Sequence, residues 1–401
     1  MLEGAATSPA GIRFPERTAA DILQSREPWS DWDDLSREVY CILGIPVDAI
    51  DMPTALRAVE NAAAADKPFL ISTPNLNYLV TSQLDPEFRE TLLLSDLCPP
   101  DGMPIVWIAR LLGLPIKDRV AGSDMIETLW GRQHCVRQLQ LFLFGGAEGA
   151  VEAAAKALNE RPGGLRCVGS IYPGFGTIED MSRDDFIDRI NASRADFLLV
   201  ALGAQKGQLW LRRNHDRLRI PVRTHLGATV NFVAGNVKRA PFIVRSFGLE
   251  WLWRIKEEPH LWRRYWNDGL SLLGLMITRV LPLALGTRWH QLRKPHSQEL
   301  AIEPSQHDGT LILSLRGAAM SRDAYEAIAV FREALATNTK ICINLSRTSA
   351  IDARFLGLLL MLKKRAIRQN VTVNFVGASS SLRTLLRRNG AGFLLAEDQR
   401  E

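Results

Sequence analysis

The chain of 401 residues is too long for one ordinary domain, and with 46% hydrophobic and 23% charged residues it has the composition of a globular protein that buries a core. Its net charge is only +5, but residues 238–294 alone contain eleven Lys or Arg against four Asp or Glu, together with five of the ten tryptophans. The five cysteines are scattered without a C-x-x-C pair, which argues against a zinc cage or a disulfide framework.

The first forty residues are polar and acidic and lack an apolar segment behind a basic start, so we expect no signal peptide and a protein that works inside the cell. We assign residues 1–37 to a flexible leader. Over residues 38–268, apolar runs that predict strands alternate with runs that predict helices, which indicates an α/β domain around a mostly parallel sheet. The predicted strands are 68–73, 140–144, 165–171 and 195–203, and the predicted helices are 101–112, 148–159 and 183–194.

Residues 270–285 are apolar except for one Ser, one Thr and one Arg, and Pro282 interrupts them. A bilayer span needs about 20 apolar residues, so sixteen with an arginine and a proline make a poor span. An interfacial helix flanked by Trp and Arg and a buried core helix are the two interpretations left. The apolar content of the basic stretch favours an anionic membrane over nucleic acid as its partner, and we assign 269–304 to a membrane-surface segment and a linker.

Residues 305–397 form a second predicted unit of about 100 residues, the usual size of a domain. Strands and helices alternate here as well, so we expect a small α/β domain. The predicted strands are 310–315, 340–345 and 371–376, and the predicted helices are 322–336, 355–369 and 381–389.

Polar residues gather where strands of the first domain end, which is where parallel sheets bind ligands. Pro74 keeps Thr73 out of the helical region, so Thr73 and Asn75 either project into a crevice or cap the following helix. Asp101 follows two prolines and precedes Gly102. It is either a helix cap, which the pattern alone favours, or a general base that takes a proton from an attacking hydroxyl.

Two further turns could hold phosphate groups. Arg119 precedes Gly122 and Ser123 at a helix start, an arrangement that suits either a diphosphate or an ordinary capped helix. Gly145 and Gly146 form a strand-to-helix turn but not a G-x-G-x-x-G motif, so a dinucleotide cofactor is not indicated. The D-x-D triplet at 31–33 lies in the leader, where a solvated acidic face explains it, and we expect neither a catalytic metal nor a cofactor.

Seven stretches occur together in a fixed order: TPNLNYL (73–79), PPDGMPIVW (99–107), DRVAGSDM (118–125), LFLFGG (141–146), YPGFG (172–176), THLGATVNFVAGNVKRAP (224–241) and GLEWLWRIKEEP (248–259). In these stretches, residues 39–265 resemble the WecG/TagA/CpsF glycosyltransferases, glycosyltransferase family 26. The resemblance implies a Rossmann-like fold of the GT-E class with a membrane-associating helical appendage. It also implies an inverting, metal-independent transfer of a sugar, often N-acetylmannosamine or a uronic acid, from a UDP-sugar to an undecaprenyl-diphosphate-linked acceptor. This reaction would take place at the inner face of the cytoplasmic membrane, in the synthesis of an exopolysaccharide or a surface glycan.

The resemblance also assigns roles to residues. The proposed base of the family falls on Asp101, and its other substrate-binding positions fall on Thr73, Asn75 and Arg119. Arginines of the appendage lie over the active site in the family, and Arg254, Arg263 and Arg264 occupy the comparable stretch. With these three arginines, the candidate donor-binding residues are Gly122, Ser123, Gly145, Gly146, Gly203, Gln205 and Gln208.

The chain departs from the family pattern at two places. Where the family has P-K-Q-E, residues 205–208 read Q-K-G-Q, so the donor-binding glutamine falls on Gly207 and its contact is lost or moved to Gln205 or Gln208. Where many members have F-D-F, residues 230–232 read V-N-F. These changes keep a second hypothesis open, a non-catalytic scaffold or regulator of polysaccharide synthesis with a degenerate donor site.

The second unit resembles STAS domains, as found in anti-sigma-factor antagonists, over ICINLSRTSAIDARFLGLLLMLKKR (341–365). Regulated STAS domains carry a phosphorylated serine in a D-S-S-G turn. Here the turn reads Asp352-Ala353-Arg354-Phe355 and offers no hydroxyl, so we do not expect a kinase-driven switch at this turn. Docking to a protein partner or self-association remains the expected role.

Overall fold

The computed structural model describes residues 32–133, 137–161, 163–241, 244–245, 248–286 and 299–395. Residues 1–31 of the predicted leader and residues 287–298 of the predicted linker lie outside the described residues, as does Cys135. The last residues assigned to the leader are part of the folded chain, because η1 (Asp34–Ser36) begins a compact unit and Arg37 is buried.

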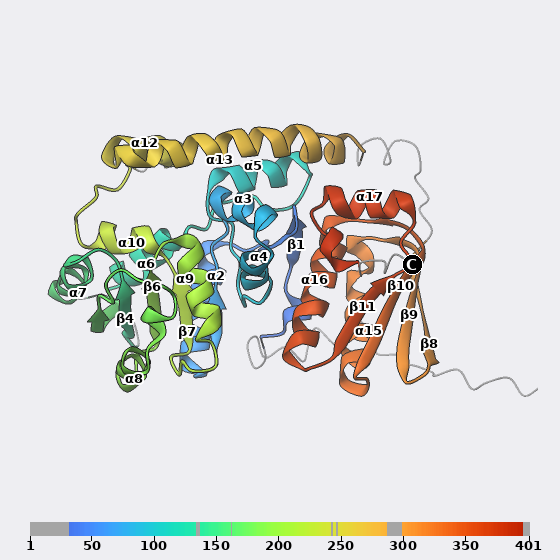
Figure 1. Cartoon of the computed structure of the whole chain (residues 1–401), viewed down its shortest axis with the longest axis horizontal. Helices are drawn as coiled ribbons and strands as arrows, with labels where there is room; N and C mark the ends of the chain where they lie inside the picture. The colour runs from blue at the N-terminus through green and yellow to red at the C-terminus, as the bar shows by residue number, and fades with distance from the viewer. Residues whose placement is uncertain are drawn as a thin grey trace, which may run out of the picture. The chain divides into compact units, whose positions relative to one another are not determined.

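A parallel sheet of five strands organises the first domain, in the order β3-β7-β6-β4-β5 (Figure 1). This confirms the α/β fold predicted from the alternation of strands and helices. The strand β6 consists of five buried apolar residues, as expected for a strand covered on both faces. The strands are β3 (Phe69–Ile71), β4 (Leu139–Gly145), β5 (Leu165–Ile171), β6 (Phe197–Ala201) and β7 (Val222–His225).

Helices cover the sheet and supply most of its core partners. Phe144 of β4 stacks on Trp210 with ring centroids 4.6 Å apart, and Phe186 packs edge-on against Phe144. The helices of this domain are α2 (Met52–Ala64), α3 (Leu76–Leu84), α4 (Pro86–Leu93), α5 (Met103–Leu111), α6 (Gly122–Gly131), α7 (Ala150–Glu160), α8 (Asp184–Ala192), α9 (Ala204–Arg213) and α10 (Gly227–Val233).

A β-hairpin that the sequence patterns did not predict precedes the parallel sheet. Strands β1 (Val39–Ile42) and β2 (Ile45–Asp48) pair antiparallel around Leu43 and Gly44, which both have positive φ angles. Two central residues of this kind make the tight turn that suits the twist of a hairpin. Every residue of both strands is buried, so the usual alternation of polar and apolar residues is absent.

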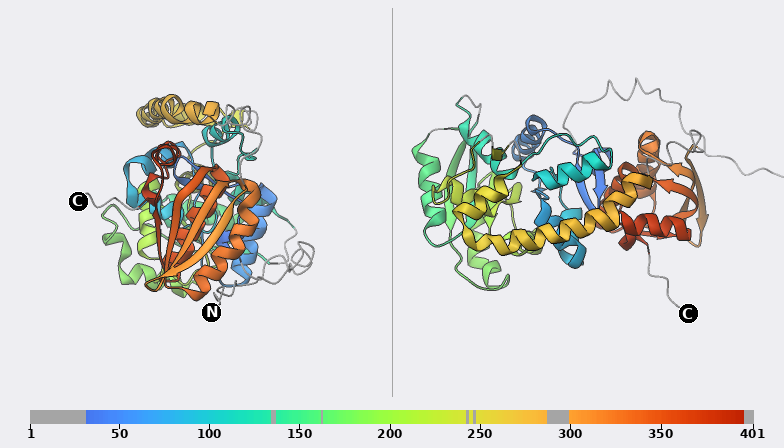
Figure 2. Two further views of the ribbon diagram at one scale, coloured as in Figure 1. Left: turned by 90° about the vertical axis from the view of Figure 1, so that its right-hand side faces the viewer. Right: turned by 90° about the horizontal axis from the view of Figure 1, so that it is seen from above.

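One long helical run follows the first domain, made of α12 (Glu250–Glu257), η3 (Pro259–Leu261), α13 (Trp262–Leu275) and η4 (Met276–Val280). The part from Pro259 to Gly286 is long and apolar enough to cross a membrane by length and composition alone. One side of it packs on the first domain, where Val280 and Leu283 are buried and α13 contacts α3 (Figures 1 and 2).

The other side of this helix carries an exposed apolar stripe. Its members recur at intervals of three or four residues, so they share one helix face. They are Trp262, Trp266, Leu270, Leu273, Ile277, Leu281 and Leu285, each between 42% and 64% exposed. The helix is therefore neither a fully buried core helix nor free on all sides.

The second domain is a four-stranded sheet in the order β11-β10-β9-β8, packed against helices (Figure 2, left). Its strands are parallel except for β8, which pairs antiparallel with β9. The strand β8 begins at Ala301, inside the stretch that the sequence assigned to the linker. The elements are β8 (Ala301–His307), β9 (Thr310–Ala319), α15 (Ala324–Thr337), β10 (Lys340–Ile351), α16 (Ala353–Arg368), β11 (Thr372–Val376) and α17 (Ser380–Arg388).

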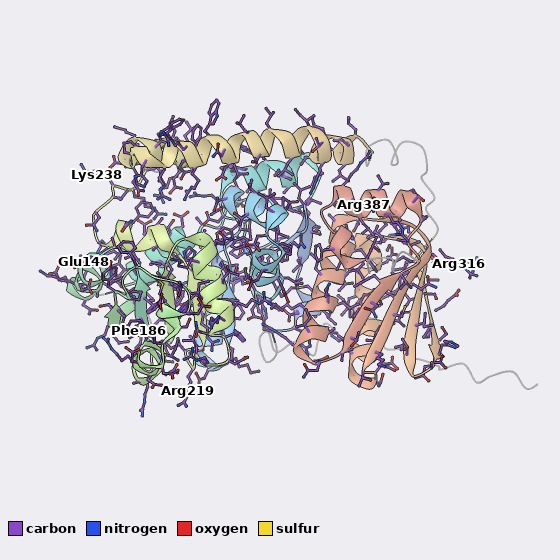
Figure 3. All side chains as sticks on the ribbon, viewed as in Figure 1. Glu148, Phe186, Arg219, Lys238, Arg316 and Arg387 are labelled. Carbon is purple, nitrogen blue, oxygen red and sulfur yellow. The ribbon has the colours of Figure 1, made fainter. Side chains whose placement is uncertain are left out.

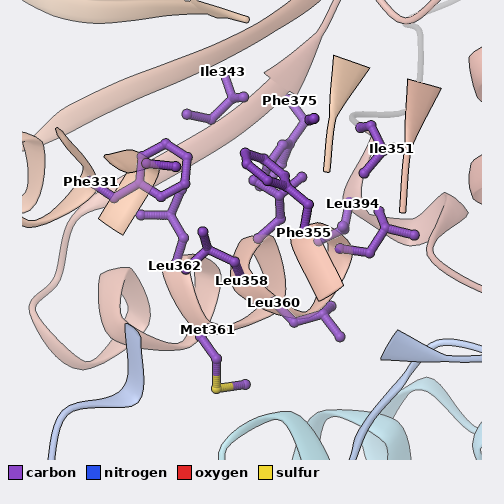
Figure 4. Packing of buried hydrophobic residues seen from close by; sticks show 14 of the residues in the cluster. Phe331, Ile343, Ile351, Phe355, Leu358, Leu360, Met361, Leu362, Phe375 and Leu394 are labelled. Atoms are coloured by element: carbon purple, nitrogen blue, oxygen red, sulfur yellow. The ribbon is translucent and has the colours of Figure 1, made fainter. Parts of the chain in front are cut away.

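Helix α16 is buried on two sides. Phe355 and Leu358 face the second-domain sheet, while Met361 points the opposite way and its sulfur lies 3.4 Å from Arg37 Nη1 (Figure 4). A Cβ at Gly357 would lie 2.1 Å from the carbonyl oxygen of Val39, so β1 touches the bare backbone of this helix. The hairpin and the second domain thus share one hydrophobic core, and this face of α16 is occupied by the same chain.

Candidate active site

Three loops of the first domain are joined by backbone hydrogen bonds around Asp101. The amide of Asp101 donates to Pro74 O at 2.9 Å, and the amide of Val120 donates to Pro100 O at 2.8 Å. Gly102, at φ +108°, occupies the cap position of α5, so Asp101 does not cap that helix. Its carboxylate instead accepts from the amide of Gly122, 3.4 Å away at the start of α6.

The environment of Asp101 changes its acidity. The pKa of its carboxyl is raised to about 7, mainly by burial and with a contribution from the nearby Glu250, while the Arg119 guanidinium and the Gly122 amide oppose this rise. A carboxylate with a pKa near neutral pH is suited to accept a proton during a reaction, because it is ionised yet still basic.

Thr73 and Asn75 lie on the loop that holds Asp101. Thr73 is buried, and Asn75 caps α3 by accepting from the amide of Tyr78 at 3.1 Å. A Cβ at Gly102 would lie 3.6 Å from the Cβ of Asn75, which places Asn75 directly beside the Asp101-Gly102 turn. Asn75 therefore has the capping role that the sequence allowed, and the structure brings it together with Asp101.

Arg119 belongs to a cluster of charged side chains beside Asp101. It donates to Asp124 at 2.8 Å and to Glu250, and Arg239 and Arg245 also donate to Asp124. Arg239 further donates to the hydroxyl of Ser123 at 2.9 Å. Sequence reasoning did not single out Arg239 and Arg245, although both lie in the basic stretch 238–294 and Arg239 lies in the V-K-R-A-P segment of the family motif.

The predicted arginines of the helical appendage separate into two groups. Arg254 is partly buried, donates to Glu258 at 2.7 Å and lies over the ring of Phe232, 5.8 Å from its centroid, while Arg239 lies over the same ring. Arg263 and Arg264 are exposed on α13 and lie over Trp262 and Tyr265. Lys238, on the connection that follows α10 (Figure 3), contacts α12, because its carbonyl accepts from Trp253 Nε1.

Three of the four predicted glycines, Gly145, Gly146 and Gly203, lie at the carboxyl ends of β4 and β6, and Gly122 begins α6. The amide of Gly146 donates to Ala201 O at 2.7 Å, and a Cβ at Gly145 would lie 2.6 Å from the same oxygen, so the two strand ends can approach only without a side chain there. Gly203 begins α9 at φ +84° and faces open space. A Cβ at Gly122 would lie 2.1 Å from Leu226, which places the loop after β7 against the start of α6.

The two candidate glutamines differ in their surroundings. Gln205 is exposed and donates to Asp85 at 2.6 Å, at the start of α4. Gln208 is fully buried, accepts from Ser72 at 3.0 Å and donates to the hydroxyl of Tyr78 at 3.2 Å. Gln208 thus links the end of β3 to α3 from beneath the loop of Thr73. Among the described residues, no group of three or more His, Cys, Asp or Glu side chains could hold a metal ion.

Residues 40–284 match the family model described as glycosyl transferase WecG/TagA/CpsF family. The chain belongs to the WecG/TagA/CpsF glycosyltransferases. Residues 302–396 match the model described as Mlab, STAS domain, so a STAS domain follows the transferase domain in the same chain. Membership makes the protein a glycosyltransferase and confirms the family inferred from the sequence motifs.

Curated relatives of the WecG/TagA/CpsF domain are named N-acetylglucosaminyldiphosphoundecaprenol N-acetyl-beta-D-mannosaminyltransferase. The one from Bacillus spizizenii is 28% identical over 50% of this chain and 75% of its own length. The one from Staphylococcus aureus is 27% identical over 53% of this chain and 82% of its own length. Among solved structures, the anti-sigma factor antagonist SpoIIAA in its unphosphorylated form aligns with 24% of this chain and 86% of its own, at 19% identity and a TM-score of 0.22.

Proposed function

We propose that this WecG/TagA/CpsF enzyme transfers a sugar from a UDP-sugar to an undecaprenyl-diphosphate-linked acceptor, with Asp101 as the general base. The donor would be N-acetylmannosamine, a uronic acid or a related sugar, and the product would enter an exopolysaccharide or surface glycan. The curated relatives carry the name of such a transferase. The observation that carries the proposal is the partly buried Asp101 carboxyl with a pKa near 7, held between Gly122 and the arginine cluster.

In the proposed reaction the acceptor hydroxyl attacks the anomeric carbon of the donor while Asp101 takes the hydroxyl proton. The bond from the anomeric carbon to the diphosphate oxygen breaks on the opposite face, so the configuration inverts and UDP leaves with the bonding electron pair. One carboxylate is protonated for each glycosidic bond formed.

Arginines beside Asp101 would stabilise the negative charge that develops on the UDP leaving group. In the described part of the chain, Arg239, Arg245 and Arg254 each have a buried Nε–H without a hydrogen-bond partner, although their terminal nitrogens bind carboxylates. Buried donors without partners are rare and costly, and a phosphate oxygen would satisfy them. The carboxylates hold the guanidinium groups in place before the diphosphate arrives, which reduces the reorganisation needed in the transition state.

The exposed apolar stripe of α13 and η4 supports a position at the membrane surface. The opposite side of the helix packs on the transferase domain, so the helix would lie in the interface rather than cross the bilayer. Between α12 and α13 there is also a hollow of about 300 Å³ lined by aromatic and apolar side chains, including Trp251, Trp262 and Trp266. Tryptophan is typical of the headgroup level of a membrane, where the lipid-linked acceptor lies.

The proposal is tested by transfer to a short-chain polyprenyl-diphosphate-linked N-acetylglucosamine, with a panel of UDP-sugars and UDP release as the readout. We expect the full-length protein to use one of these donors. The substitution Asp101→Asn should lower kcat by about 10²–10⁴-fold. The variant should still bind UDP in calorimetry. Full turnover by Asp101→Asn would remove Asp101 from the mechanism, and failure of the wild-type protein to bind UDP would favour the scaffold hypothesis.

A further inference from the structure

His225 is the last residue of strand β7, which lies between β3 and β6, and it has one ring nitrogen without a partner. Its Nδ1 lies 2.9 Å from the hydroxyl of Tyr78, and the residue is only 6% exposed. Its Nε2 is buried and makes no hydrogen bond among the described residues. A buried nitrogen of this kind usually has a ligand, a water molecule or a functional role, since an unpaired polar atom costs free energy.

The neighbours of His225 determine which of its nitrogens carries the proton. The hydroxyl of Tyr78 accepts from Gln208 Nε2 at 3.2 Å, which leaves its own hydrogen free to be donated to His225 Nδ1. A neutral imidazole with an accepting Nδ1 carries its proton on Nε2. Burial lowers the pKa of His225 to about 4, so the ring is neutral at physiological pH and Nε2 is a neutral donor.

Two glycines leave room for this ring. A Cβ at Gly207 would lie 2.1 Å from the Cδ2 of His225, and a Cβ at Gly227 would lie 3.3 Å from Nε2. Gly207 is the position at which the family pattern P-K-Q-E has its glutamine. The imidazole of His225 therefore fills the space that a side chain at position 207 would need, and it brings a polar nitrogen to that space.

His225 also lies close to the candidate base. It stands at the carboxyl end of a parallel strand, where such sheets bind ligands. The next residue, Leu226, abuts Gly122, whose amide donates to the Asp101 carboxylate. The charge of Asp101 contributes, after burial, to the raised pKa of Tyr78, the direct partner of His225.

We propose that His225 Nε2 donates a hydrogen bond to an oxygen of the donor sugar and thereby helps to select which UDP-sugar the enzyme uses. This inference rests on the proposed function. A neutral imidazole suits a hydroxyl or amide oxygen of the sugar, whereas the arginine cluster suits the charged diphosphate. In this proposal His225 binds the sugar of the donor, and the arginine cluster binds its diphosphate.

The test compares the affinities of the full-length protein for UDP and for its preferred UDP-sugar, measured by calorimetry. His225→Phe removes both nitrogens with little change in volume, and His225→Gln provides a second variant should the first fail to fold. The matched control is His215→Gln, since His215 is a partly buried histidine whose ring lies against Arg223.

We expect His225→Phe to lower the ratio of UDP-sugar affinity to UDP affinity by about tenfold, the worth of one hydrogen bond, and to leave UDP affinity within about twofold of wild type. An unchanged ratio, or an equal loss of both affinities, would overturn the inference while leaving the proposed function intact. Absence of binding to UDP and to every UDP-sugar in the wild-type protein would overturn both.

A pair of exchanges tests the spatial relationship between positions 207 and 225. Gly207→Gln alone should abolish donor binding, because its Cβ would overlap the His225 ring. Adding His225→Gly should relieve this overlap, restore binding and change the order of preference in the panel of UDP-sugars. A double variant with the wild-type order of preference would show that neither position contacts the sugar.

Discussion

Lys364 of the STAS domain places its ammonium nitrogen 2.9 Å from the carboxylate of Asp96 in the transferase domain, and both side chains are buried. The same nitrogen binds Asp34 and the carbonyl of Ser95. Asp96 in turn accepts from the amide of Leu70 in β3 at 2.9 Å. Burial alone would raise the pKa of Asp96, but the nearby positive charges, Lys364 first among them, outweigh this effect and hold the pKa well below its usual range.

This ion pair is one end of a chain of hydrogen bonds that leads to the candidate active site. The hydroxyl of Ser95 lies 2.6 Å from that of Ser72, Ser72 donates to Gln208, and Gln208 continues through Tyr78 to His225. The STAS helix α16 is thereby joined to the strand end that precedes Thr73. The STAS domain thus contacts the loop that leads into the candidate active site.

The Lys364–Asp96 pair predicts a large effect of a single substitution. Lys364→Met removes the ammonium that two buried carboxylates share, while Arg37 and Arg368 remain as their partners. We expect it to lower the free energy of unfolding by about 1.5–3 kcal/mol in urea titrations. Lys363→Met is the matched control, because Lys363 is partly exposed and lies over the ring of Phe393. That variant should cost less than about 1 kcal/mol. Equal effects of the two changes would contradict the importance of the buried pair.

The raised pKa of Asp101 predicts the pH dependence of catalysis. The base must be ionised, so kcat/KM should rise with pH and level off above about 7. Glu250→Gln removes a charge that raises this pKa and also frees Arg119, so its profile should move to lower pH. Arg119→Gln should move the profile to higher pH. Glu127→Gln is the control, because Glu127 belongs to the arginine cluster but is not among the charges with the largest effect on the pKa of Asp101.

The same shift predicts a stability effect with a definite sign. A carboxyl whose pKa is higher in the folded state stabilises the fold below its unfolded pKa of about 4, and this contribution is lost as pH rises through about 7. Asp101→Asn should therefore be more stable than the wild type at pH 8, by at most about 4 kcal/mol, and show no such gain at pH 4. Thermal unfolding at the two pH values measures the difference, and an equal gain at both would exclude ionisation as its cause.

The apolar stripe predicts membrane binding that depends on particular residues. Replacing Trp266 and Leu270 by Ser removes apolar surface from the middle of the stripe, and we expect binding to anionic liposomes to weaken by about tenfold or more. Phe175→Ser is the control, because Phe175 is 96% exposed and lies outside the stripe. Liposome flotation of the full-length protein measures both. An equal loss in the control, or none in the stripe variant, would contradict interfacial binding.

Much of the fold could be predicted because its signals are local. Continuous apolar runs such as the one that forms β6 identify buried parallel strands, and the strand predicted at 165–171 coincides with β5. The β1–β2 hairpin was missed because all of its residues are buried, so no alternation marks it. Its burial results from contact with the transferase core on one side and with the STAS domain, more than 300 residues away in the chain, on the other, and no local pattern reports either contact.

The candidate site was predictable only through its loop motifs. Four candidate residues directly follow strands or turns that the sequence indicates, namely Thr73, Asn75, Asp101 and Arg119. The structure brings these four residues together. His225 was missed because β7 reads V-R-T-H and has no apolar run that would mark a strand end. Its significance depends on the missing side chain at Gly207 and on the hydroxyl of Tyr78. Arg239 and Arg245 look like ordinary surface residues in the sequence, since only the fold brings them to Asp124.

The contact between α16 and β1 predicts opposite effects for two chemically identical substitutions. Gly357→Ala would place a methyl group 2.1 Å from the carbonyl oxygen of Val39, so α16 or β1 must move, and we expect a loss of about 1–3 kcal/mol in the free energy of unfolding. Gly274→Ala in α13 meets nothing within 4 Å and should stabilise the protein by about 0.5–1 kcal/mol, because alanine favours the helix. Urea titration of both variants measures the contrast. If Gly357→Ala were as well tolerated as Gly274→Ala, the transferase and STAS domains could not be packed backbone to backbone at this position.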